Sequence, residues 1–370
     1  MIGKLLLKDG SIWQGESFGA PISAAGEAVF ATGMVGYPES LTDPSYRGQI
    51  LVMTYPLIGN YGVPPSSTWE SGKIQVAGLV VSTYNDTPSH FLSRRTLAKW
   101  LQAEKIPALE IKDTRALTLH LREKGCVLGI LSMGNIPPQS PLILRGEQSE
   151  FPPSYNKRGV GGDIRFADPN LCNLVAEVSV KRLKIIGKGK KTIVVLDCGV
   201  KQNIIRELLK RNVKVIQAPW NFNPFKAKTK FHGLLVSNGP GDPKMCQATI
   251  VTVRQAIAKK IPIFGICLGN QILALAAGGD TAKMKFGHRG QNQPVSLIGT
   301  KRCYLTTQNH GFEVKKVPKG FRQWFINLND GTNEGIIHHS KKFMSVQFHP
   351  ESCPGPMDTS WLFDYFLEKI

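Results

Sequence analysis

The sequence predicts an α/β protein of two domains, in which a β-rich mixed α/β part precedes a doubly wound, mostly parallel sheet. Three observations predict this fold class. The chain has 370 residues, more than a single domain of ordinary size requires. Short apolar runs separated by Gly, Pro and Asn fill the first part. From Thr192 onward, continuous β-branched runs alternate with helical patterns, as in a parallel sheet covered by helices.

A β-hairpin is expected where the chain begins. The apolar runs 4–7 and 11–13 flank Asp9-Gly10, and an Asp-Gly between apolar runs is a strong hairpin signal. Further strands are expected at 27–32, 49–54 and 75–81. Helices are expected at 94–104, with Ser93 as N-cap, and at 114–124, where Asp113 can cap the start and Gly125 can end the helix.

A domain boundary is predicted near residue 190. Residues 136–170 are rich in Pro and Gly, which is typical of an extended, loop-like crossing. The basic segment 181–191 is expected to complete this linker. The predicted domains are therefore 1–190, which includes the linker, and 191–370.

The second domain is expected to be a parallel sheet with helices on both faces. Strands are expected at 192–197, 214–217, 233–237 and 262–266, and helices at 203–211 and 248–259. Nearly all residues of these strands are apolar, as in strands buried on both faces. In such sheets the functional site lies at the carboxyl ends of the strands.

Composition and charge exclude several classes of protein. No run of eighteen apolar residues exists, so no membrane span is expected. Met1–Asp9 resembles neither a signal nor a transit peptide, so no targeting peptide is expected. The seven cysteines are scattered without a C-x-x-C pair, which argues against a disulfide framework or a metal site and favours a reducing compartment.

The formal net charge of +19 makes nucleic-acid binding one alternative. The basic residues are, however, spread along the chain, and their only dense run lacks interleaved aromatic residues. We expect no nucleic-acid partner, and a basic face toward an acidic protein or an anionic substrate explains the charge better.

Cys267 is the candidate nucleophile. It follows an apolar strand and precedes a helical pattern that begins at Leu268 and stops at Gly278-Gly279. A helix N-terminus favours a thiolate, and Gly265 and Gly269 suit a tight turn around the sulfur. The alternative is a buried, inert thiol, which is the commoner role of a cysteine beside an apolar run.

A general base and an oxyanion site have candidates elsewhere. His349 ends a predicted strand, 343–349, and Glu351 can accept from its second nitrogen. The alternative for His349 is a surface histidine at a strand end, and for Glu351 a solvated loop acid. The turn 237–243 follows a buried strand, and its glycines would let backbone N–H groups approach a substrate. An ordinary strand-ending turn is the alternative there.

These stretches resemble a known family. Gly265-Ile266-Cys267-Leu268-Gly269-Asn270-Gln271 is similar to the nucleophile elbow of class I glutamine amidotransferases, Phe348-His349-Pro350-Glu351 to their histidine–glutamate motif, and 237–243 to their oxyanion turn. The stretches 32–39, 41–46, 54–60, 113–115 and 121–125 resemble the N-terminal domain of carbamoyl-phosphate synthase small subunits. Residues 283–290 and 307–312 are similar to the same subunit, so the resemblance runs through nearly the whole chain.

The resemblance implies a class I glutaminase fold for the second domain and a catalytic triad. Cys267 would attack the side-chain amide of L-glutamine to give a thioester and ammonia, His349 would act as base and acid, and Glu351 would orient it. The implied glutamine-binding residues are Ser45, reaching across from the first domain, Gly239, Gly241, Leu268, Gln271, Asn309, Gly311 and Phe312. For each of these, a structural role as core, turn or cap is the alternative. Asn270 departs from the family, many members of which carry histidine there, but no role above requires it.

The resemblance also implies a partner. Ammonia would pass to a large synthetase subunit that makes carbamoyl phosphate from bicarbonate and ATP, for pyrimidine and arginine synthesis. No cofactor is expected in this chain, and ATP and metal ions are expected on the large subunit. The absence of a G-x-x-x-x-G-K-[ST] loop agrees with this. The sequence stops at Ile370, which predicts a separate large subunit in a heterodimer rather than fused synthetase domains. Assembly beyond this pair stays open.

Two further matters follow from the resemblance. The expected compartment is the cytoplasm of a bacterium, or the plastid stroma for a plastid-encoded protein. The alternative functions are the glutaminase of anthranilate or GMP synthesis, against which the separate first domain argues, and an inactive regulatory scaffold. The presence of Cys267, His349 and Glu351 together argues against the scaffold.

Overall fold

The computed structural model describes residues 1–133 and 166–370, which form two compact units. The first unit comprises Met1–Thr32 and Tyr46–Leu171, and the second comprises Gly33–Ser45 and Cys172–Ile370. Most of the Pro- and Gly-rich crossing predicted at 136–170 lies outside the described residues. Each unit has its own apolar core and is described by itself.

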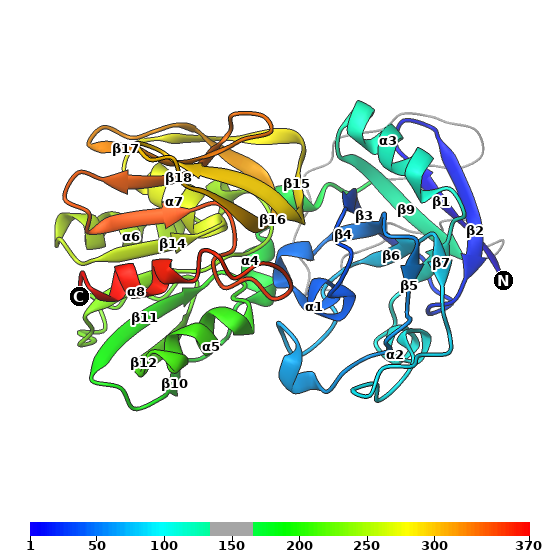
Figure 1. Cartoon of the computed structure of the whole chain (residues 1–370), viewed down its shortest axis with the longest axis horizontal. Coiled ribbons are helices and arrows are strands. Elements are labelled where there is room, and N and C mark those ends of the chain that lie inside the picture. Colours follow the sequence, from blue (N-terminus) through cyan, green and yellow to red (C-terminus); the bar gives the residue numbers. More distant parts are fainter. Residues whose placement is uncertain (134–165) are drawn as a thin grey trace. The chain divides into compact units, whose positions relative to one another are not determined.

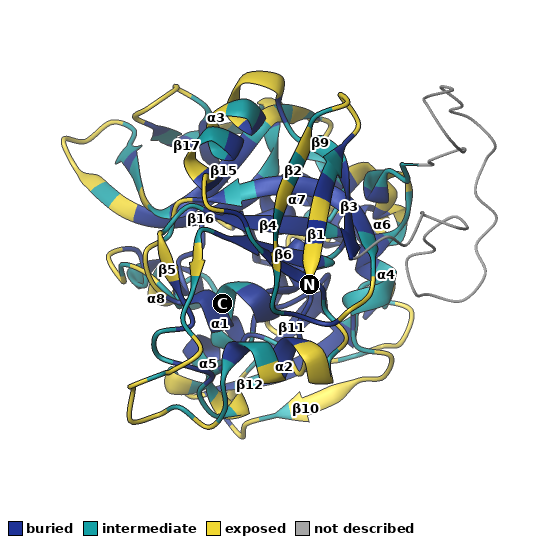
Figure 2. Ribbon diagram, turned by 90° about the vertical axis from the view of Figure 1, so that its right-hand side faces the viewer, coloured by how far each residue is buried: buried dark blue, intermediate teal, exposed yellow. Residues whose placement is uncertain are grey.

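The first unit is built on a closed β-barrel (Figure 1). Its strands, in spatial order, are β1 (Ile2–Leu7), β2 (Ile12–Ser17), β8 (Ala108–Glu110), β6 (Gly78–Val81), β4 (Gln49–Met53), β3 (Ala24–Ala31) and β9 (Val127–Met133). The predicted hairpin is confirmed, because β1 and β2 pair antiparallel with Leu6 opposite Ile12. Strands β4 and β6 are almost wholly buried (Figure 2). Closure of the barrel leaves no free strand edge in it.

Two helices of the first unit test the capping predictions. Helix α3 (Thr114–Lys124) begins and ends where predicted, and Asp113 Oδ1 accepts from the backbone N–H of Ala116 at 2.8 Å. Helix α2 (Leu97–Ala103) begins later than predicted, with Thr96 rather than Ser93 as its cap. The reason is that Arg95, just before the cap, pairs with Val63 in a β-bridge and so keeps this segment extended. A small sheet of β5 (Leu57–Ile58) and β7 (Thr83–Tyr84) completes the unit's strands within the described residues.

The second unit contains a sheet of ten strands. Their spatial order is β10 (Lys184–Ile186), β12 (Val213–Pro219), β11 (Lys191–Asp197), β13 (Gly233–Val236), β14 (Ile263–Ile266), β19 (Phe343–Val346), β18 (Asn333–His338), β17 (Phe321–Asn327), β15 (Asp280–Leu297) and β16 (Cys303–Lys316). The five strands from β12 to β19 are parallel, as predicted. The strands β18, β17, β15 and β16 extend this sheet with antiparallel pairing and were not predicted.

Helices cover both faces of the parallel strands (Figure 1). Along β11, Ile193 and Val195 pack with α5 (Gln202–Lys210) and α8 (Trp361–Leu367). The alternate residues Val194 and Leu196 pack with α6 (Gln247–Ala258) and α7 (Leu268–Ala276). Burial on both faces explains why the strand sequence is apolar throughout. The short helices α1 (Tyr37–Thr42) and α4 (Leu174–Val178) also belong to this unit.

The units divide the chain at Leu171/Cys172 rather than at residue 190. The basic segment predicted as a linker contains β10, an exposed edge strand that pairs antiparallel with β12 (Figure 2). Just before it, Val180 donates its backbone N–H to Asp197 Oδ2 at 3.1 Å. An edge strand needs few apolar residues, so its composition did not distinguish it from a linker. Among the described helices, none has the length and apolar character needed to cross a membrane.

Candidate active site

Cys267 lies in a strained turn between β14 and α7. Its backbone φ and ψ are 54° and −103°, a conformation that residues with a side chain rarely adopt. Two backbone hydrogen bonds hold it: Cys267 N–H donates to the carbonyl of Val346 at 2.8 Å, and Asn270 N–H donates to the carbonyl of Cys267 at 3.0 Å. Strain of this kind persists only where the surroundings enforce it, and it is the conformation of a nucleophile elbow.

Glycines on both sides make the turn possible. A Cβ on Gly265 would lie 2.4 Å from the carbonyl oxygen of Gly269. A Cβ on Gly269 would lie 2.1 Å from the carbonyl oxygen of Val236. In both cases the obstacle is backbone, which cannot move aside as a flexible side chain could. The tight turn expected from the sequence is confirmed, and it places the sulfur at the carboxyl end of β14.

The thiol of Cys267 is buried but has polar surroundings. Only 2% of the residue is exposed, which agrees with one part of the inert-thiol alternative. The sulfur, however, donates to the carbonyl oxygen of Asn309 at 3.6 Å and interacts with the imidazole of His349. A thiol packed only for its apolar surface would not have both of these neighbours.

His349 is held against Glu351 beyond the end of β19. The predicted strand 343–349 is shorter in the structure and ends at Val346, because His349 instead pairs with Thr307 in an isolated bridge. His349 Nδ1 lies 2.6 Å from Glu351 Oε1, and both side chains are at most 1% exposed. The alternatives of a surface histidine and a solvated acid are therefore wrong.

Lys201 is a third charged member of this group, and the sequence analysis gave it no role. Its Nζ lies 3.1 Å from Glu351 Oε1 and donates to the carbonyl of Ser352 at 2.6 Å, with a side chain that is 4% exposed. A lysine buried to this degree needs a charged partner. Its only signal in the sequence is its place at the carboxyl end of β11, at the start of α5.

These charges set the protonation of the group. Burial alone would raise the pKa of Glu351, but Lys201 and His349 lower it to about 2. Burial alone would lower the pKa of His349, but the charge of Glu351, the neighbouring Cys267 side chain and the hydrogen bond to Glu351 raise it to about 10. His349 is therefore a strong base toward the neighbouring thiol, and Glu351 remains a carboxylate at neutral pH.

The turn after β13 lies beside the elbow. A Cβ on Gly239 would lie 2.0 Å from the carbonyl oxygen of Cys198 and 3.0 Å from a methyl carbon of Leu268, so only glycine fits there. Gly241 has a φ of +81°, which also favours glycine. The structure thus brings Gly239 next to Leu268, the residue that follows the candidate nucleophile.

Strand β16 contributes three of the predicted site residues. Phe312 accepts at its carbonyl from Gln271 Nε2 at 2.9 Å, and this ties the strand to α7. Asn309 receives the thiol hydrogen bond, and Gly311 lies beside Arg289, since a Cβ there would be 3.2 Å from a guanidinium nitrogen. Of the three, Asn309 therefore contacts Cys267 directly, and Phe312 contacts the helix that begins after Cys267.

Ser45 also reaches this site, although not from the unit to which it was assigned. The segment Gly33–Ser45 packs in the second unit. Ser45 Oγ accepts from Asn238 Nδ2 at 2.9 Å, in the turn after β13. Asp43, two residues earlier, accepts from Asn309 Nδ2 at 2.9 Å. Asp43 lies in the stretch 41–46 that resembles the family, but no role was predicted for it from the sequence.

Asn270, where the elbow departs from the family motif, is fully buried and structural. Its Nδ2 donates to Gln347 Oε1 at 3.0 Å, and its Oδ1 accepts from Ser345 Oγ at 2.8 Å. It therefore ties α7 to β19 and the residues after it.

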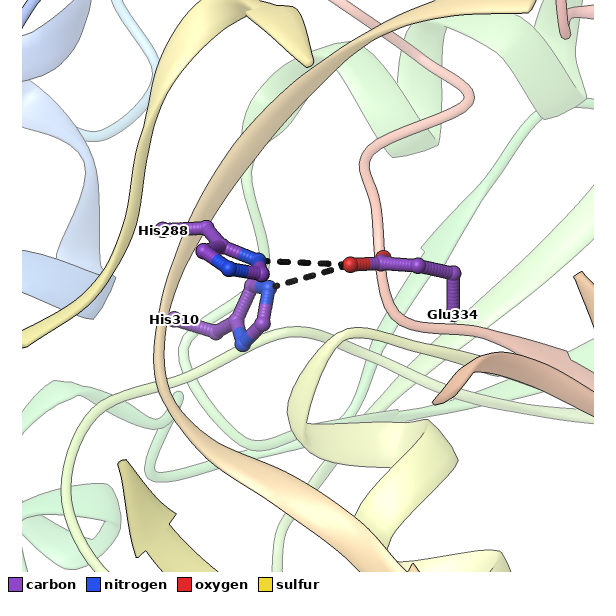
Figure 3. A group of neighbouring side chains, drawn as sticks. All are labelled: His288, His310 and Glu334. Carbon is purple, nitrogen blue, oxygen red and sulfur yellow. Dashed lines mark ion pairs between the residues drawn. The ribbon is translucent and has the colours of Figure 1, made fainter. Parts of the chain in front are cut away.

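Behind the site, His288, His310 and Glu334 have ligand atoms within 4.8 Å of one another, close enough for one metal ion (Figure 3). His288 Nδ1 and His310 Nε2 lie 3.3 Å and 3.9 Å from Glu334 Oε1. The other ring nitrogens lie 2.8 Å from Asp330 Oδ2 and 2.9 Å from the carbonyl oxygen of Phe312. Burial lowers the pKa of His288, but Glu334 and Asp330 outweigh it and raise that pKa. A protonated His288 that donates to both carboxylates accounts for this cluster without a metal ion.

Two family models match the chain. Residues 194–369 match glutamine amidotransferase class-I, and residues 5–131 match the CPSase domain of the carbamoyl-phosphate synthase small chain. A carbamoyl phosphate synthase arginine-specific small chain of Neurospora crassa is 43% identical over 98% of this chain and 79% of its own length. A multifunctional protein of the same organism is 46% identical over 99% of this chain but only 21% of its own length.

The chain spans between 16% and 21% of the multifunctional relatives that it matches. Among solved structures, a glutamine amidotransferase from Thermotoga maritima aligns with 49% of this chain and 84% of its own, with a TM-score of 0.36 and 17% identity.

Proposed function

Because the chain belongs to the carbamoyl-phosphate synthase small-chain family, we propose that it is a glutaminase that supplies ammonia for carbamoyl phosphate synthesis. One observation of the structure supports this proposal above the others. Cys267 sits in a strained elbow, and its neighbour His349 is held by Glu351 at 2.6 Å in a buried, charged group. A nucleophile, a base and an orienting carboxylate in that order are what covalent catalysis at an amide requires.

In the proposed first step, Cys267 Sγ forms a bond to the side-chain carbonyl carbon of glutamine. His349 takes the thiol proton and returns it to the amide nitrogen, and the carbon–nitrogen bond breaks to release ammonia. Glu351 accepts from Nδ1 of His349 throughout, which keeps Nε2 directed at the reacting atoms. The product on the enzyme is a γ-glutamyl thioester of Cys267.

In the second step a water molecule attacks the thioester carbonyl. His349 takes a proton from this water and gives it to the departing sulfur, so that glutamate leaves and the thiol is restored. In both steps negative charge develops on the carbonyl oxygen. The backbone N–H groups of Gly239 and Leu268 are our candidates for its oxyanion site. Leu268 is the first residue of α7, and the first N–H groups of a helix have no partner within the helix.

The proposed glutamine pocket joins four segments of the second unit. The turn after β13, the start of α7 and strand β16 surround the thiol, and the segment 33–45 adds Ser45. Polar side chains and backbone groups there can bind the ammonium and carboxylate of an amino acid. The residues we propose for glutamine binding are Ser45, Gly239, Gly241, Leu268, Gln271, Asn309, Gly311 and Phe312.

We propose that the ammonia is used by a synthetase that binds ATP, metal ions and bicarbonate. The small chains among the relatives support a separate large subunit. The multifunctional relatives carry a region similar to this chain within one longer protein. In either arrangement, ATP and metal ions would bind to the synthetase part.

A paired assay tests the proposed activity. We expect the wild type to release ammonia and glutamate in equal amounts from L-glutamine, and Cys267→Ala to release neither above background. Cys303→Ala removes an exposed cysteine of β16 and serves as the matched control, with activity unchanged. Equal ammonia release from wild type and Cys267→Ala would contradict the proposal. When a purified synthetase partner is added, glutamine should also support carbamoyl phosphate formation with the wild type but not with Cys267→Ala.

A further inference from the structure

Asp43 is a buried carboxylate that lies outside the proposed catalytic group. It follows α1 directly and is 5% exposed. Its Oδ1 accepts from the backbone N–H of Ser45 at 2.9 Å and from Asn238 Nδ2 at 3.4 Å. Its Oδ2 accepts from Asn309 Nδ2 at 2.9 Å. One carboxylate thus joins the segment 33–45, the turn after β13 and strand β16.

The carboxylate fixes the direction of two amide side chains. A carboxylate can only accept, so Asn238 and Asn309 must both turn their NH₂ groups toward Asp43. Asn238 is fixed from its other end as well, because its Oδ1 accepts from the backbone N–H of Lys201 at 3.0 Å. For Asn309 this direction leaves Oδ1, an acceptor, on the side away from Asp43.

The same arrangement fixes whether the hydroxyl of Ser45 donates or accepts a hydrogen bond toward the ligand. Its Oγ already accepts from Asn238 Nδ2 at 2.9 Å. In the described part of the chain, no acceptor is found for its hydroxyl proton. The hydroxyl is therefore available as a donor, whereas Asn309 presents an acceptor. A donor and an acceptor on two residues that both bind Asp43 match a ligand that carries a carboxylate and an ammonium group on one carbon.

We propose that Asp43 is a positioning residue that makes this site selective for ligands with a free α-amino acid head. The inference rests on the proposed glutaminase function, since Ser45 and Asn309 are proposed glutamine contacts. Asp43 has protein donors on both oxygens and touches no reacting atom. It acts by fixing which atoms of Ser45 and Asn309 can donate a hydrogen bond to the ligand and which can accept one.

Replacing Asp43 with Asn turns one acceptor oxygen into a donor. The new NH₂ group at position 43 then lies opposite the NH₂ group of Asn309 or of Asn238, and two donors cannot form a hydrogen bond. Asn309 can recover a hydrogen bond by turning its amide over. Its NH₂ group would then face the ligand's ammonium. We expect the KM for glutamine to rise by about 10-fold to 100-fold in Asp43→Asn, with kcat changed by less than about 3-fold.

Selectivity between two substrates gives a readout that general structural damage would not change. L-glutamine carries the ammonium group, and glutaramate (4-carbamoylbutanoate) is the same amide without it. We expect wild type to prefer L-glutamine strongly in kcat/KM, and Asp43→Asn to lose at least about 10-fold of that preference. Asn309→Ala removes the acceptor itself and should lose the preference to a similar extent. Adding Asp43→Asn to Asn309→Ala should then change the preference little further.

Binding in the Cys267→Ala background separates this proposal from the proposed function. Calorimetric titration of the full chain, with any co-purifying partner retained, measures the affinity for L-glutamine and for glutaramate. The affinity ratio should fall by at least about 10-fold on adding Asp43→Asn. A wild type that binds glutamine without hydrolysing it would contradict the glutaminase function alone. An unchanged preference in both Asp43→Asn and Asn309→Ala would overturn the role of Asp43, and alkylation of Cys267 by iodoacetamide at the wild-type rate would verify that the site is folded.

Discussion

At the scale of single residues, the site depends on charges that balance one another in a buried place. Glu351 is stabilised by Lys201 on one side and by His349 on the other. Removing one partner from a buried charged group leaves the remaining charge without compensation, and this usually costs more than the pair contributes. Lys201 also opposes the protonation of His349, because its positive charge lowers the pKa of the imidazole.

Lys201→Met tests this balance. Without the ammonium, the pKa of Glu351 rises and the pKa of His349 rises further above about 10, so the alkaline limb of the pH profile of kcat/KM, where His349 loses its proton, should move to higher pH. We expect the free energy of unfolding at neutral pH to fall by about 1–3 kcal/mol, because a buried carboxylate loses a hydrogen-bonded partner. Urea unfolding and glutaminase assays across pH measure both effects.

Lys210→Met is the matched control for this substitution. Lys210 lies on the same helix, α5, but its side chain is 60% exposed and pairs with Glu207. Its loss should change stability by no more than about 0.5 kcal/mol and leave the pH profile unchanged. A pH profile of Lys201→Met that coincides with wild type would show that Lys201 does not act on His349.

At the scale of elements, the antiparallel strands support the site from behind. His288 of β15 lies directly opposite His310 of β16, and Glu334 of β18 closes the cluster. The folded state raises the pKa of His288 above its unfolded value. The stability gained from its protonation is therefore fully present below the unfolded pKa, about 6.5, and is lost as pH rises through the raised value.

The free energy of unfolding should therefore decrease as pH rises from neutral into the alkaline range. Glu334→Gln removes the largest attraction for the proton on His288 and should make this decrease smaller. Urea unfolding of both proteins at several pH values measures the slope. Glu313→Gln removes a carboxylate of β16 outside this cluster, serves as the matched control and should leave the slope unchanged. A slope in Glu334→Gln equal to that of wild type would contradict the assignment of the proton.

The elements also show where sequence patterns are informative. Helix α3 was predicted with both its ends because Asp113 and Gly125 act locally. The parallel strands were predicted because burial on two faces leaves a continuous apolar run, as in β11. Strands β15 and β16 pair through residues that include His288, Gln308 and Asn309, and such polar sequences show no strand pattern. Their place in the sheet depends on pairing between distant segments, which local patterns do not reveal.

At the scale of the whole molecule, the motifs identified the candidate nucleophile, base and carboxylate, because each depends on a few neighbouring residues. The structure brings Cys267 and His349 together, although 81 residues lie between them in the sequence. Lys201 and Asp43 could not be predicted to join them. Lys201 belongs to none of the motifs, and Asp43 lies in the similar stretch 41–46 without a predicted role of its own. The role of each exists only because chain folding brings distant partners to its side chain.

The division of the chain into units also could not be predicted from composition. The segment Gly33–Ser45 lies within the first half of the sequence but packs with the second unit, where Ser45 meets the turn after β13. Likewise, β10, which lies within the basic segment 181–191, belongs to the edge of the large sheet rather than to a linker. Both depend on tertiary contacts, which the amino-acid composition of a segment does not reveal.

The most direct test of the proposed chemistry is to trap the covalent intermediate. The full chain is mixed with L-glutamine, quenched rapidly in acid and digested, and the peptide that contains Cys267 is examined by mass spectrometry. We expect this peptide to gain the mass of one glutamyl group in the wild type, hydroxylamine to remove the added group, and Cys267→Ala to give no adduct. Ammonia release by the wild type with no adduct on Cys267 under any quench time, or with the adduct on another cysteine, would contradict the proposed chemistry.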